Sequence, residues 1–302
     1  MAEFKFLQNP ITKKWIILDP ARSKRPNVGH KAEQICPFCI GREGEEQELY
    51  RVGGEERDSN WHIRVVRNKF PFAPIHEIVI HSPDHHKNFE ELPLSHIELI
   101  LGTYRARYLE NQSHGQVYIF HNRGIGGGES LPHPHTQVTV IPKSVTLDLP
   151  PLDTTFYPSS LFFKKKKKEE TVNSSHFYIY CPLFSQWPDE VWVVPMQKGK
   201  CFGDITDKEI TDLAFILSRL IGIFDLRHGH EFPFNFYIYP GKNWYLRIFP
   251  RIKILGGFEM GSGIVVNTQD RAETFAFIKE HFFEPNLEKI RVEQKEDYWK
   301  SV

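Results

Sequence analysis

Short apolar runs bounded by turn residues recur along the chain, which is typical of β-strands. In the first part of the chain the pattern predicts strands at residues 11–18, 63–66, 76–81, 116–121 and 137–141. In the second part it predicts strands at residues 176–180, 190–194, 234–239 and 244–249. Most of these runs are only four to eight residues long, so we expect sheets built from short strands.

Three segments have apolar residues at helical spacing instead: residues 89–107, 204–226 and 268–282. In the second of them Thr206 is the expected N-cap and Glu209 completes a capping box, because the two side chains can satisfy each other's backbone N–H groups. Strands and helices therefore come twice in similar order. This arrangement predicts an α+β protein with two halves.

The pattern is interrupted between the two halves. Pro150, Pro151 and Pro158 break it, and five consecutive lysines at 164–168 are followed by two glutamates. A run of like charges is typical of a solvated linker or hairpin tip. We therefore expect an N-terminal domain at residues 1–145, a linker at 146–175 and a C-terminal domain at 176–302.

Composition excludes several classes of function. The chain has 302 residues, of which 40% are hydrophobic, and its 38 basic residues equal its 38 acidic ones. Zero net charge argues against bulk binding to nucleic acid or an anionic membrane. The sequence has no run of 18 apolar residues, its N-terminus lacks the apolar region of a signal peptide, and four cysteines make no disulfide framework. A cytoplasmic protein without membrane or nucleic-acid partners is expected.

The first chemical motif is Cys36-Pro-Phe-Cys39. Alone it fits a redox pair, half of a zinc site or coincidence. A redox motif should open a helix after a strand, whereas Gly41-Arg42-Glu43 follows this one. Zinc needs two more ligands in a tetrahedron, and His85 and His133 are candidates. The zinc interpretation is favoured.

The second motif is His133-Pro134-His135-Thr136-Gln137. In an extended chain His133, His135 and Gln137 share one face, spaced by roughly 6.5–7 Å per step. Burying such a polar face requires partners for every polar atom, so it indicates function. A neutral imidazole can attack phosphorus directly. Gln137 and the backbone N–H groups of the glycine-rich turn at residues 124–128 can then hold the phosphate oxygens.

Together these segments resemble the galactose-1-phosphate uridylyltransferase branch of the histidine-triad superfamily. The resemblance rests on residues 9–26, Cys36-Pro-Phe-Cys39, residues 67–71, residues 82–85 and residues 122–137, which follow in the family's order. At the second motif, histidine-triad hydrolases carry the pattern HxHxH, whereas the transferases and phosphorylases that this chain resembles carry HxHxQ. Gln137 therefore favours transfer to an acceptor over hydrolysis.

The resemblance implies roles for individual residues. It implies that His135 is the nucleophile, that Gln137 hydrogen-bonds the phosphoryl group, and that Cys36, Cys39, His85 and His133 bind a structural zinc. The further candidates for substrate binding are Arg22, Arg25, Asn68, Asn122, Gly126, Gly127, Gly128, Ser130 and Glu259. For Glu259, which can hold a sugar hydroxyl, a structural role is an equal alternative. The resemblance also implies a homodimer.

The C-terminal half matches the family less completely. Known members have histidines near the positions of Tyr239, Tyr245 and Arg247, some of which bind a second metal. Those histidines are absent here, so no second metal is expected. Cys181 and Cys201 have no partner signature and are expected to pack in the core.

The sequence therefore predicts two histidine-triad-like halves, each an antiparallel sheet packed with helices. The predicted reaction is ping-pong transfer of a nucleoside monophosphate between a nucleotide-sugar and a sugar 1-phosphate, as in a UDP-glucose–hexose-1-phosphate uridylyltransferase of galactose metabolism. One alternative is a phosphorylase of ADP-sugars or dinucleoside polyphosphates that uses inorganic phosphate. A second alternative is a non-catalytic nucleotide-sugar binding protein.

Overall fold

The computed structural model of the protein describes residues 4–24, 36–152 and 171–290. Arg25 and the lysine run at residues 164–168 lie outside the described residues, as does much of the predicted linker. Within the described ranges no helix combines the length and the apolar character that crossing a membrane requires.

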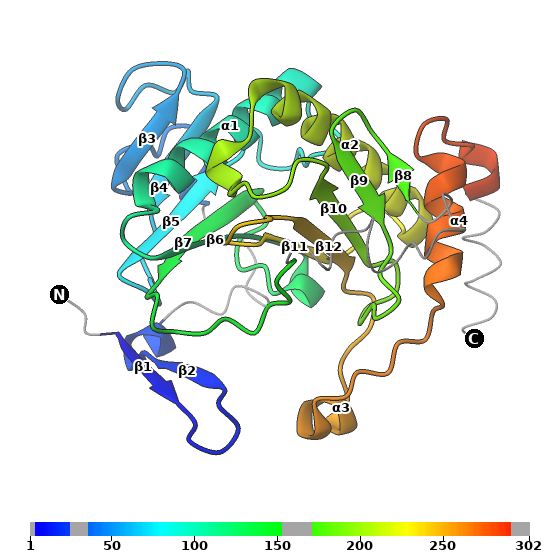
Figure 1. The fold of residues 1–302 in the computed structure, drawn as a ribbon. Helices are drawn as coiled ribbons and strands as arrows, with labels where there is room; N and C mark the ends of the chain where they lie inside the picture. The colour runs from blue at the N-terminus through cyan, green and yellow to red at the C-terminus, as the bar shows by residue number, and fades with distance from the viewer. Residues whose placement is uncertain (1–3, 25–35, 153–170, 291–302) are drawn as a thin grey trace.

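One antiparallel sheet of ten strands runs through the molecule (Figure 1). From edge to edge its strands are β3 (Glu48–Val52), β4 (Ile63–Arg67), β5 (Ile75–Ile80), β7 (His135–Ile141), β6 (Gln116–Arg123), β11 (Phe234–Ile238), β12 (Leu246–Pro250), β10 (Val191–Pro195), β9 (Phe177–Tyr180) and β8 (Val172–Asn173). Each half contributes antiparallel strands packed with helices, which confirms the predicted α+β fold. The two half-sheets are continuous, because β6 pairs with β11.

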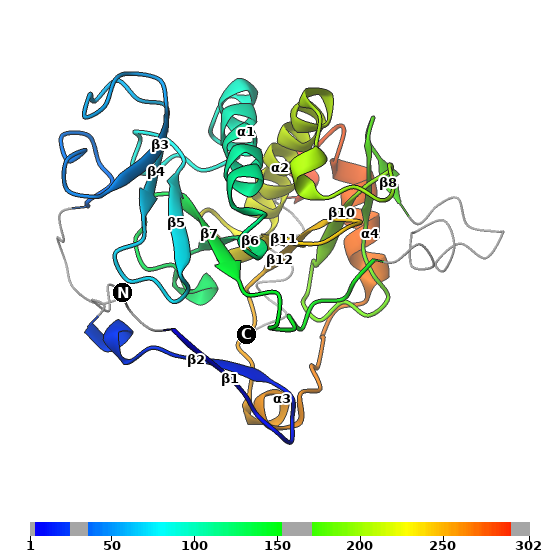
Figure 2. The same ribbon diagram turned by 60° about the vertical axis from the view of Figure 1, so that its left-hand side comes forward.

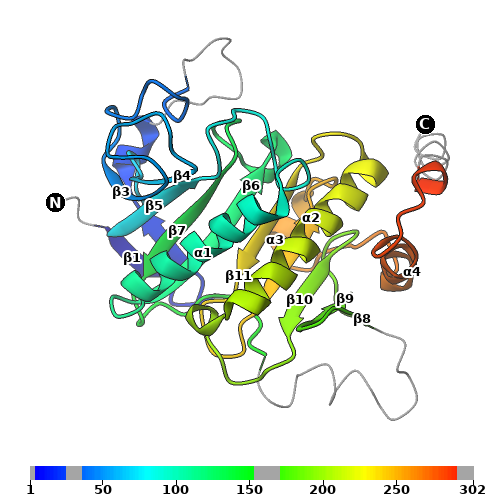
Figure 3. The same ribbon diagram turned by 90° about the horizontal axis from the view of Figure 1, so that it is seen from above.

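Helices α1 (Leu94–Asn111) and α2 (Asp207–His228) lie side by side across one face of the sheet (Figure 3). Side chains on that face, such as Ile119, Val138 and Phe236, form the main core with both helices. Since strand residues alternate between faces, their neighbours along the chain point to the opposite face. That opposite face is therefore the one that carries His135 and Gln137.

The helix boundaries follow local capping chemistry. At the start of α2 the Thr206 hydroxyl accepts a hydrogen bond from the Glu209 backbone N–H (3.3 Å), and the Glu209 carboxylate accepts one from Thr206 (2.7 Å), as predicted. Helix α1 begins at Leu94, after Pro93, later than the predicted residue 89. A proline disfavours the helical conformation of the residue before it, so the helix cannot easily extend back through Leu92. Phe89 and Leu92 are buried in the core without belonging to the helix.

A hairpin of β1 (Lys5–Gln8) and β2 (Trp15–Leu18) forms a separate small sheet. The predicted strand at residues 11–18 is half correct, because Ile11 lies in the turn, where the Asn9 side chain accepts hydrogen bonds from two backbone N–H groups. The hairpin and the short helix α3 (Gly257–Ser262) both extend from the side of the sheet that faces away from α1 and α2 (Figures 1 and 2). A fourth helix, α4 (Arg271–His281), follows α3.

Candidate active site and metal centre

The His135 side chain is buried at the start of the central strand β7, between β5 and β6. Its ring nitrogen Nδ1 lies 2.8 Å from the carbonyl oxygen of His133. A carbonyl oxygen only accepts, so Nδ1 must carry the hydrogen. The lone pair of the neutral ring is then on Nε2. The backbone of the motif thereby prepares Nε2 as a nucleophile.

Gln137 is oriented by His76, a residue of β5 that sequence analysis missed. The backbone N–H of Phe72 donates to His76 Nδ1 (3.3 Å), so the ring hydrogen is on Nε2. That nitrogen lies 2.9 Å from Oε1 of Gln137 and donates to it. The amide oxygen of Gln137 is thus held by His76, and its NH₂ group is the end that can donate to a phosphoryl oxygen.

Asn68 and Arg22 flank this pair. Asn68 Oδ1 accepts a hydrogen bond from the backbone N–H of Phe70 (2.8 Å). Its Nδ2 contacts His76 Nε2 at 3.1 Å without donating to it, because that nitrogen carries the ring hydrogen. Arg22 donates to the Phe70 carbonyl oxygen (2.8 Å) and lies 5.0 Å from the Phe72 ring. Burial lowers the pKa of the Arg22 guanidinium. The structure therefore places Asn68 against His76, the partner of Gln137, and Arg22 against the neighbouring Phe70 and Phe72.

A second set of histidines lies beneath the site, on the helix-facing side of the sheet. His121 of β6 has its Nδ1 3.0 Å from the carbonyl oxygen of His135, to which it donates. Its ring stacks on those of His81 and Phe236, and burial is the main cause that lowers the pKa of His121 to about 3. The ring is therefore neutral at physiological pH. Sequence analysis missed this support, since only the register between β6 and β7 places His121 under His135.

The glycine-rich turn at residues 124–128 directly follows β6. Gly124 and Gly128 have φ angles of 71° and 79°, which favour glycine. A Cβ atom on Gly127 would lie 2.9 Å from the Phe234 carbonyl oxygen, so the turn packs closely on β11. The backbone N–H of Gly124 donates to the Glu129 carboxylate (2.8 Å), and burial raises the pKa of Glu129 to about 7.

Asn235 of β11 holds this turn and Asn122 together. Its side-chain NH₂ group donates to Asn122 Oδ1 (2.8 Å) and to the carbonyl oxygen of Gly127 (2.7 Å). The predicted substrate-binding residue Asn122 is therefore positioned from the C-terminal half. Ser130 is half-buried in the segment between the turn and His133.

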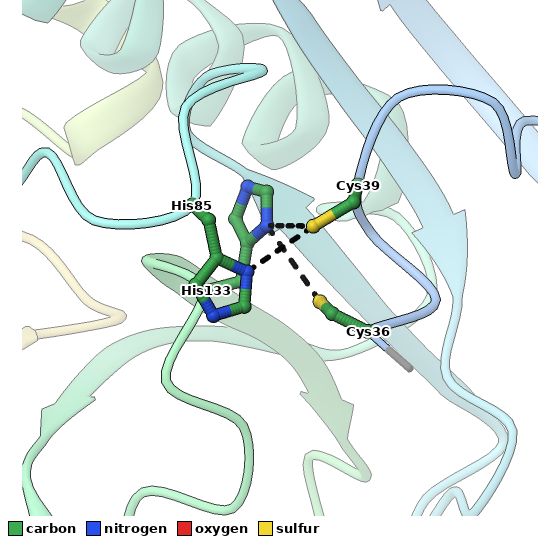
Figure 4. A group of neighbouring side chains, drawn as sticks. All are labelled: Cys36, Cys39, His85 and His133. Atoms are coloured by element: carbon green, nitrogen blue, oxygen red, sulfur yellow. Dashed lines mark hydrogen bonds between the residues drawn. The ribbon is translucent and has the colours of Figure 1, made fainter. Parts of the chain in front are cut away.

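The Cys36, Cys39, His85 and His133 side chains form a cluster whose ligand atoms all lie within 4.8 Å of one another (Figure 4). His133 Nδ1 is 3.7 Å from each sulfur, and His85 Nδ1 is 3.1 Å from Cys39 Sγ. A tetrahedral ion with sulfur and nitrogen ligands places those atoms roughly 3.3–3.8 Å apart. The four residues therefore fit a metal ion.

Hydrogen bonding outside the cluster supports this fit. His133 Nε2 donates to the Ser82 carbonyl oxygen (2.8 Å), which leaves the Nδ1 lone pair directed at the two sulfurs. Burial lowers the pKa of His133 to about 4 and raises that of Cys36 to about 11. A neutral imidazole is ready to bind a metal, and a cation would favour the thiolate form of Cys36.

Comparisons with known proteins agree with this geometry. The N-terminal domain family of galactose-1-phosphate uridyl transferase matches residues 74–140. An ADP-glucose phosphorylase of Arabidopsis thaliana is 29% identical over 86% of this chain and 88% of its own length. A galactose-1-phosphate uridylyltransferase of Thermotoga maritima is 26% identical over 78% of this chain and 79% of its own length.

Solved structures show the same relationship. The crystal structure of an Arabidopsis thaliana ADP-glucose phosphorylase with bound ADP-glucose has a TM-score of 0.71 and 26% identity, covering 93% of this chain and 100% of that one. The chain is therefore similar to the galactose-1-phosphate uridylyltransferase-like family over most of its length. This is an enzyme family of nucleotidyltransferases and phosphorylases.

One predicted substrate-binding residue lies apart from the rest. Glu259 is in α3, the helix that extends away from the sheet, and its carboxylate pairs with Lys253 (2.9 Å) and accepts from the Gly256 backbone. Those contacts hold the helix start. None of its contacts links it to His135 in the described part of the chain.

The C-terminal half has a buried ion pair at Arg247, one of the three positions at which the resemblance leads us to look for histidines. Arg247 lies 2.8 Å from the Glu190 carboxylate, and both side chains are buried among aromatic rings. Cys181 belongs to the main core, and Cys201 packs against it. Both cysteines are where the sequence predicted them to be.

Proposed function

We propose that the protein transfers a nucleoside monophosphate from a nucleotide-sugar to a phosphate acceptor through a covalent nucleotidyl-His135. The observation that carries the proposal is the hydrogen bond from His135 Nδ1 to the His133 carbonyl oxygen, which leaves the nucleophilic lone pair on Nε2. Gln137, with its NH₂ group turned outward by His76, lies two residues along the same strand face.

The reaction follows in two displacements. Nε2 of His135 attacks the α-phosphorus, and the bond from phosphorus to the bridging oxygen breaks, so that sugar 1-phosphate leaves with the electron pair. An oxygen of the acceptor phosphate then attacks the same phosphorus, and the bond to Nε2 breaks. The modified ring is positively charged, and its Nδ1–H bond to the His133 carbonyl oxygen stabilises that charge.

For the substrates, we favour an ADP-sugar as donor and inorganic phosphate as acceptor. The supporting observation is the similarity to an ADP-glucose phosphorylase over 86% of this chain and 88% of that protein. The second candidate uses UDP-glucose and a hexose 1-phosphate. It is supported by the family match at residues 74–140 and by the Thermotoga maritima relative.

We also propose that the metal is zinc, held by Cys36, Cys39, His85 and His133. With four protein ligands such an ion has a structural role, because no coordination position is left for substrate. The site would fix His133, whose carbonyl oxygen orients His135.

A homodimer is proposed as the active assembly, as the family resemblance implies. The hairpin and the α3 segment both carry exposed apolar side chains on the same side of the molecule, including Ile11 (87% exposed), Ile254 (91%) and Met260 (71%). Apolar surfaces of this kind usually mark an interaction site, and a second copy of the chain would cover them.

The covalent intermediate provides the test. The protein is incubated with ADP-glucose or UDP-glucose without acceptor, kept alkaline to preserve the phosphoramidate, and measured as intact chain by mass spectrometry. We expect an added mass of about 329 Da for an adenylyl or 306 Da for a uridylyl group. His135→Ala should show no adduct, and His114→Ala, an exposed histidine just beyond α1, serves as the matched control.

The acceptor is identified by discharging the adduct with either inorganic phosphate or galactose 1-phosphate. An adduct that forms on His135→Ala would contradict the assignment of the nucleophile. Nucleotide-sugar binding with neither adduct nor turnover would instead favour the non-catalytic alternative.

A further inference from the structure

A row of polar side chains crosses the sheet from the candidate nucleophile into the C-terminal half. Asn122 of β6 lies beside β7, and Asn235 is its register partner on β11. Asn235 Oδ1 in turn accepts a hydrogen bond from Nη1 of Arg251 (2.9 Å), the residue that follows β12. The backbone of Arg251 donates to the Pro233 carbonyl oxygen, which extends the ladder by one residue.

Arg251 differs from Arg247 and Arg123, two other arginines of this sheet that have acidic partners. Arg247 pairs with Glu190 at 2.8 Å and Arg123 pairs with Glu90 at 2.6 Å. For Arg251, no carboxylate lies within ion-pair distance among residues 4–24, 36–152 and 171–290. Its guanidinium instead stacks on the Trp187 ring at 4.5 Å.

The Arg251 cation is also partly removed from water. Its Nε atom is buried and has no hydrogen-bond partner in the described part of the chain, and burial lowers the pKa of the guanidinium. A desolvated cation without a counter-charge costs free energy, which a bound anion would offset. Guanidinium groups match the geometry of phosphate oxygens particularly well.

We propose that Arg251 binds the phosphate next to the one that bonds to His135. This inference rests on the proposed function and extends its site into the C-terminal half. In the first displacement the bound group is the β-phosphate of the nucleotide-sugar, and in the second it is the acceptor phosphate. Arg251 follows β12, three strand spacings from β7, but its guanidinium reaches back to Asn235 of β11, which is two spacings or roughly 10 Å from β7. By the alternation of strand residues, His135 and Arg251 lie on the same face, away from α1 and α2. A diphosphate hydrogen-bonded to a guanidinium spans that range.

Binding of nucleotides with one or two phosphates tests the proposal without catalysis. The dissociation constants of AMP, ADP, UMP and UDP are measured by calorimetry for the wild type and for Arg251→Gln. We expect the dissociation constants of the diphosphates to rise by about tenfold or more, as for loss of a charge-assisted hydrogen bond. Those of the monophosphates should change less than twofold.

Two further variants complete the design. Arg251→Lys retains the charge and should weaken diphosphate binding less than Arg251→Gln does. Arg219→Gln is the matched control, because Arg219 is a half-exposed arginine that stacks on Phe215 of helix α2. In turnover assays Arg251→Gln should raise the KM for inorganic phosphate while nucleotidyl-His135 still forms at saturating donor.

The outcomes separate this inference from the proposed function. Equal weakening of monophosphates and diphosphates would mean that Arg251 acts only through Asn235, and unchanged binding of both would mean that it binds no phosphate. Either result overturns the inference while the nucleotidyl-His135 adduct still supports the proposed function. If Arg251→Gln does not fold, Arg251→Lys replaces it, and the same comparison of diphosphate with monophosphate dissociation constants decides the question. Absence of the adduct in the wild type overturns both.

Discussion

The histidines of this chain differ in role because their ring nitrogens have different neighbours. His133 donates through Nε2 and so directs Nδ1 at two sulfurs, whereas His135 donates through Nδ1 and so keeps its lone pair on Nε2. His76 donates to Gln137. At the scale of residues, the chemistry is therefore set by tautomers, and backbone atoms near the motif fix most of them.

His121 is expected to position His135 by holding its carbonyl oxygen from beneath the sheet. His121→Asn keeps an N–H donor at nearly the same place, whereas His121→Leu has the same shape as Asn without the donor. We expect kcat of the Leu variant to be about fivefold to tenfold below that of the Asn variant, with KM nearly unchanged.

Both substitutions remove the same stacking on Phe236, so steady-state kinetics of the pair isolates the hydrogen bond. Thermal unfolding of both variants checks that they remain folded at the assay temperature. Identical kcat values for the two would show that His121 has only a packing role.

At the scale of elements, the proposed zinc site joins three segments that lie outside the strands. Cys36 and Cys39 precede β3, His85 follows β5, and His133 precedes β7. Since the ligands are far apart in sequence, a bound ion closes long loops and stabilises the fold.

Removing the ion is expected to loosen these segments first. Elemental analysis should find about one zinc per chain, and Cys36→Ser should lose most of it, whereas Cys201→Ser should not. Chelation should lower the unfolding temperature and increase amide hydrogen exchange near His133. A zinc-free wild type with unchanged exchange and unchanged unfolding temperature would rule out the structural role.

Local sequence patterns predicted the elements that local chemistry determines. The capping box at Thr206 marks the start of α2, and the predicted strand at residues 137–141 lies within β7, which begins two residues earlier at His135. Strand β3 was not predicted, because none of its residues is buried and two of the five are charged. Strand β1 was missed for a similar reason, since the hairpin buries few of its side chains.

At the scale of the whole molecule, some residues of the site come from segments far from the HPHTQ motif in the sequence. Asn235 and Arg251 reach it only because β6 pairs with β11, more than a hundred residues away in sequence. His76 and His121 likewise come from neighbouring strands. The motifs could be identified from sequence, whereas these supporting residues depend on the register of the complete sheet.

Dimerisation is expected to depend on the two apolar projections. Light scattering should give a mass of about twice 35.4 kDa for the wild type. Ile254→Asp combined with Phe258→Asp should shift the protein toward monomer, because charge is costly in an apolar interface. Leu109→Asp, an exposed position on α1, is the control. A wild type that is monomeric at micromolar concentration, or a double variant that remains a dimer, would refute this interface.

The junction between β6 and β11 also limits how the gene can be divided. Expressed without its C-terminal half, the chain would expose β6 as an edge strand. The unpaired backbone N–H and C=O groups of residues such as Phe120 and Asn122 could then pair with a strand of another molecule. Such a fragment would aggregate even though it holds every residue of both motifs. Separating the halves would therefore require a new capping strand or helix as a substitute for β11.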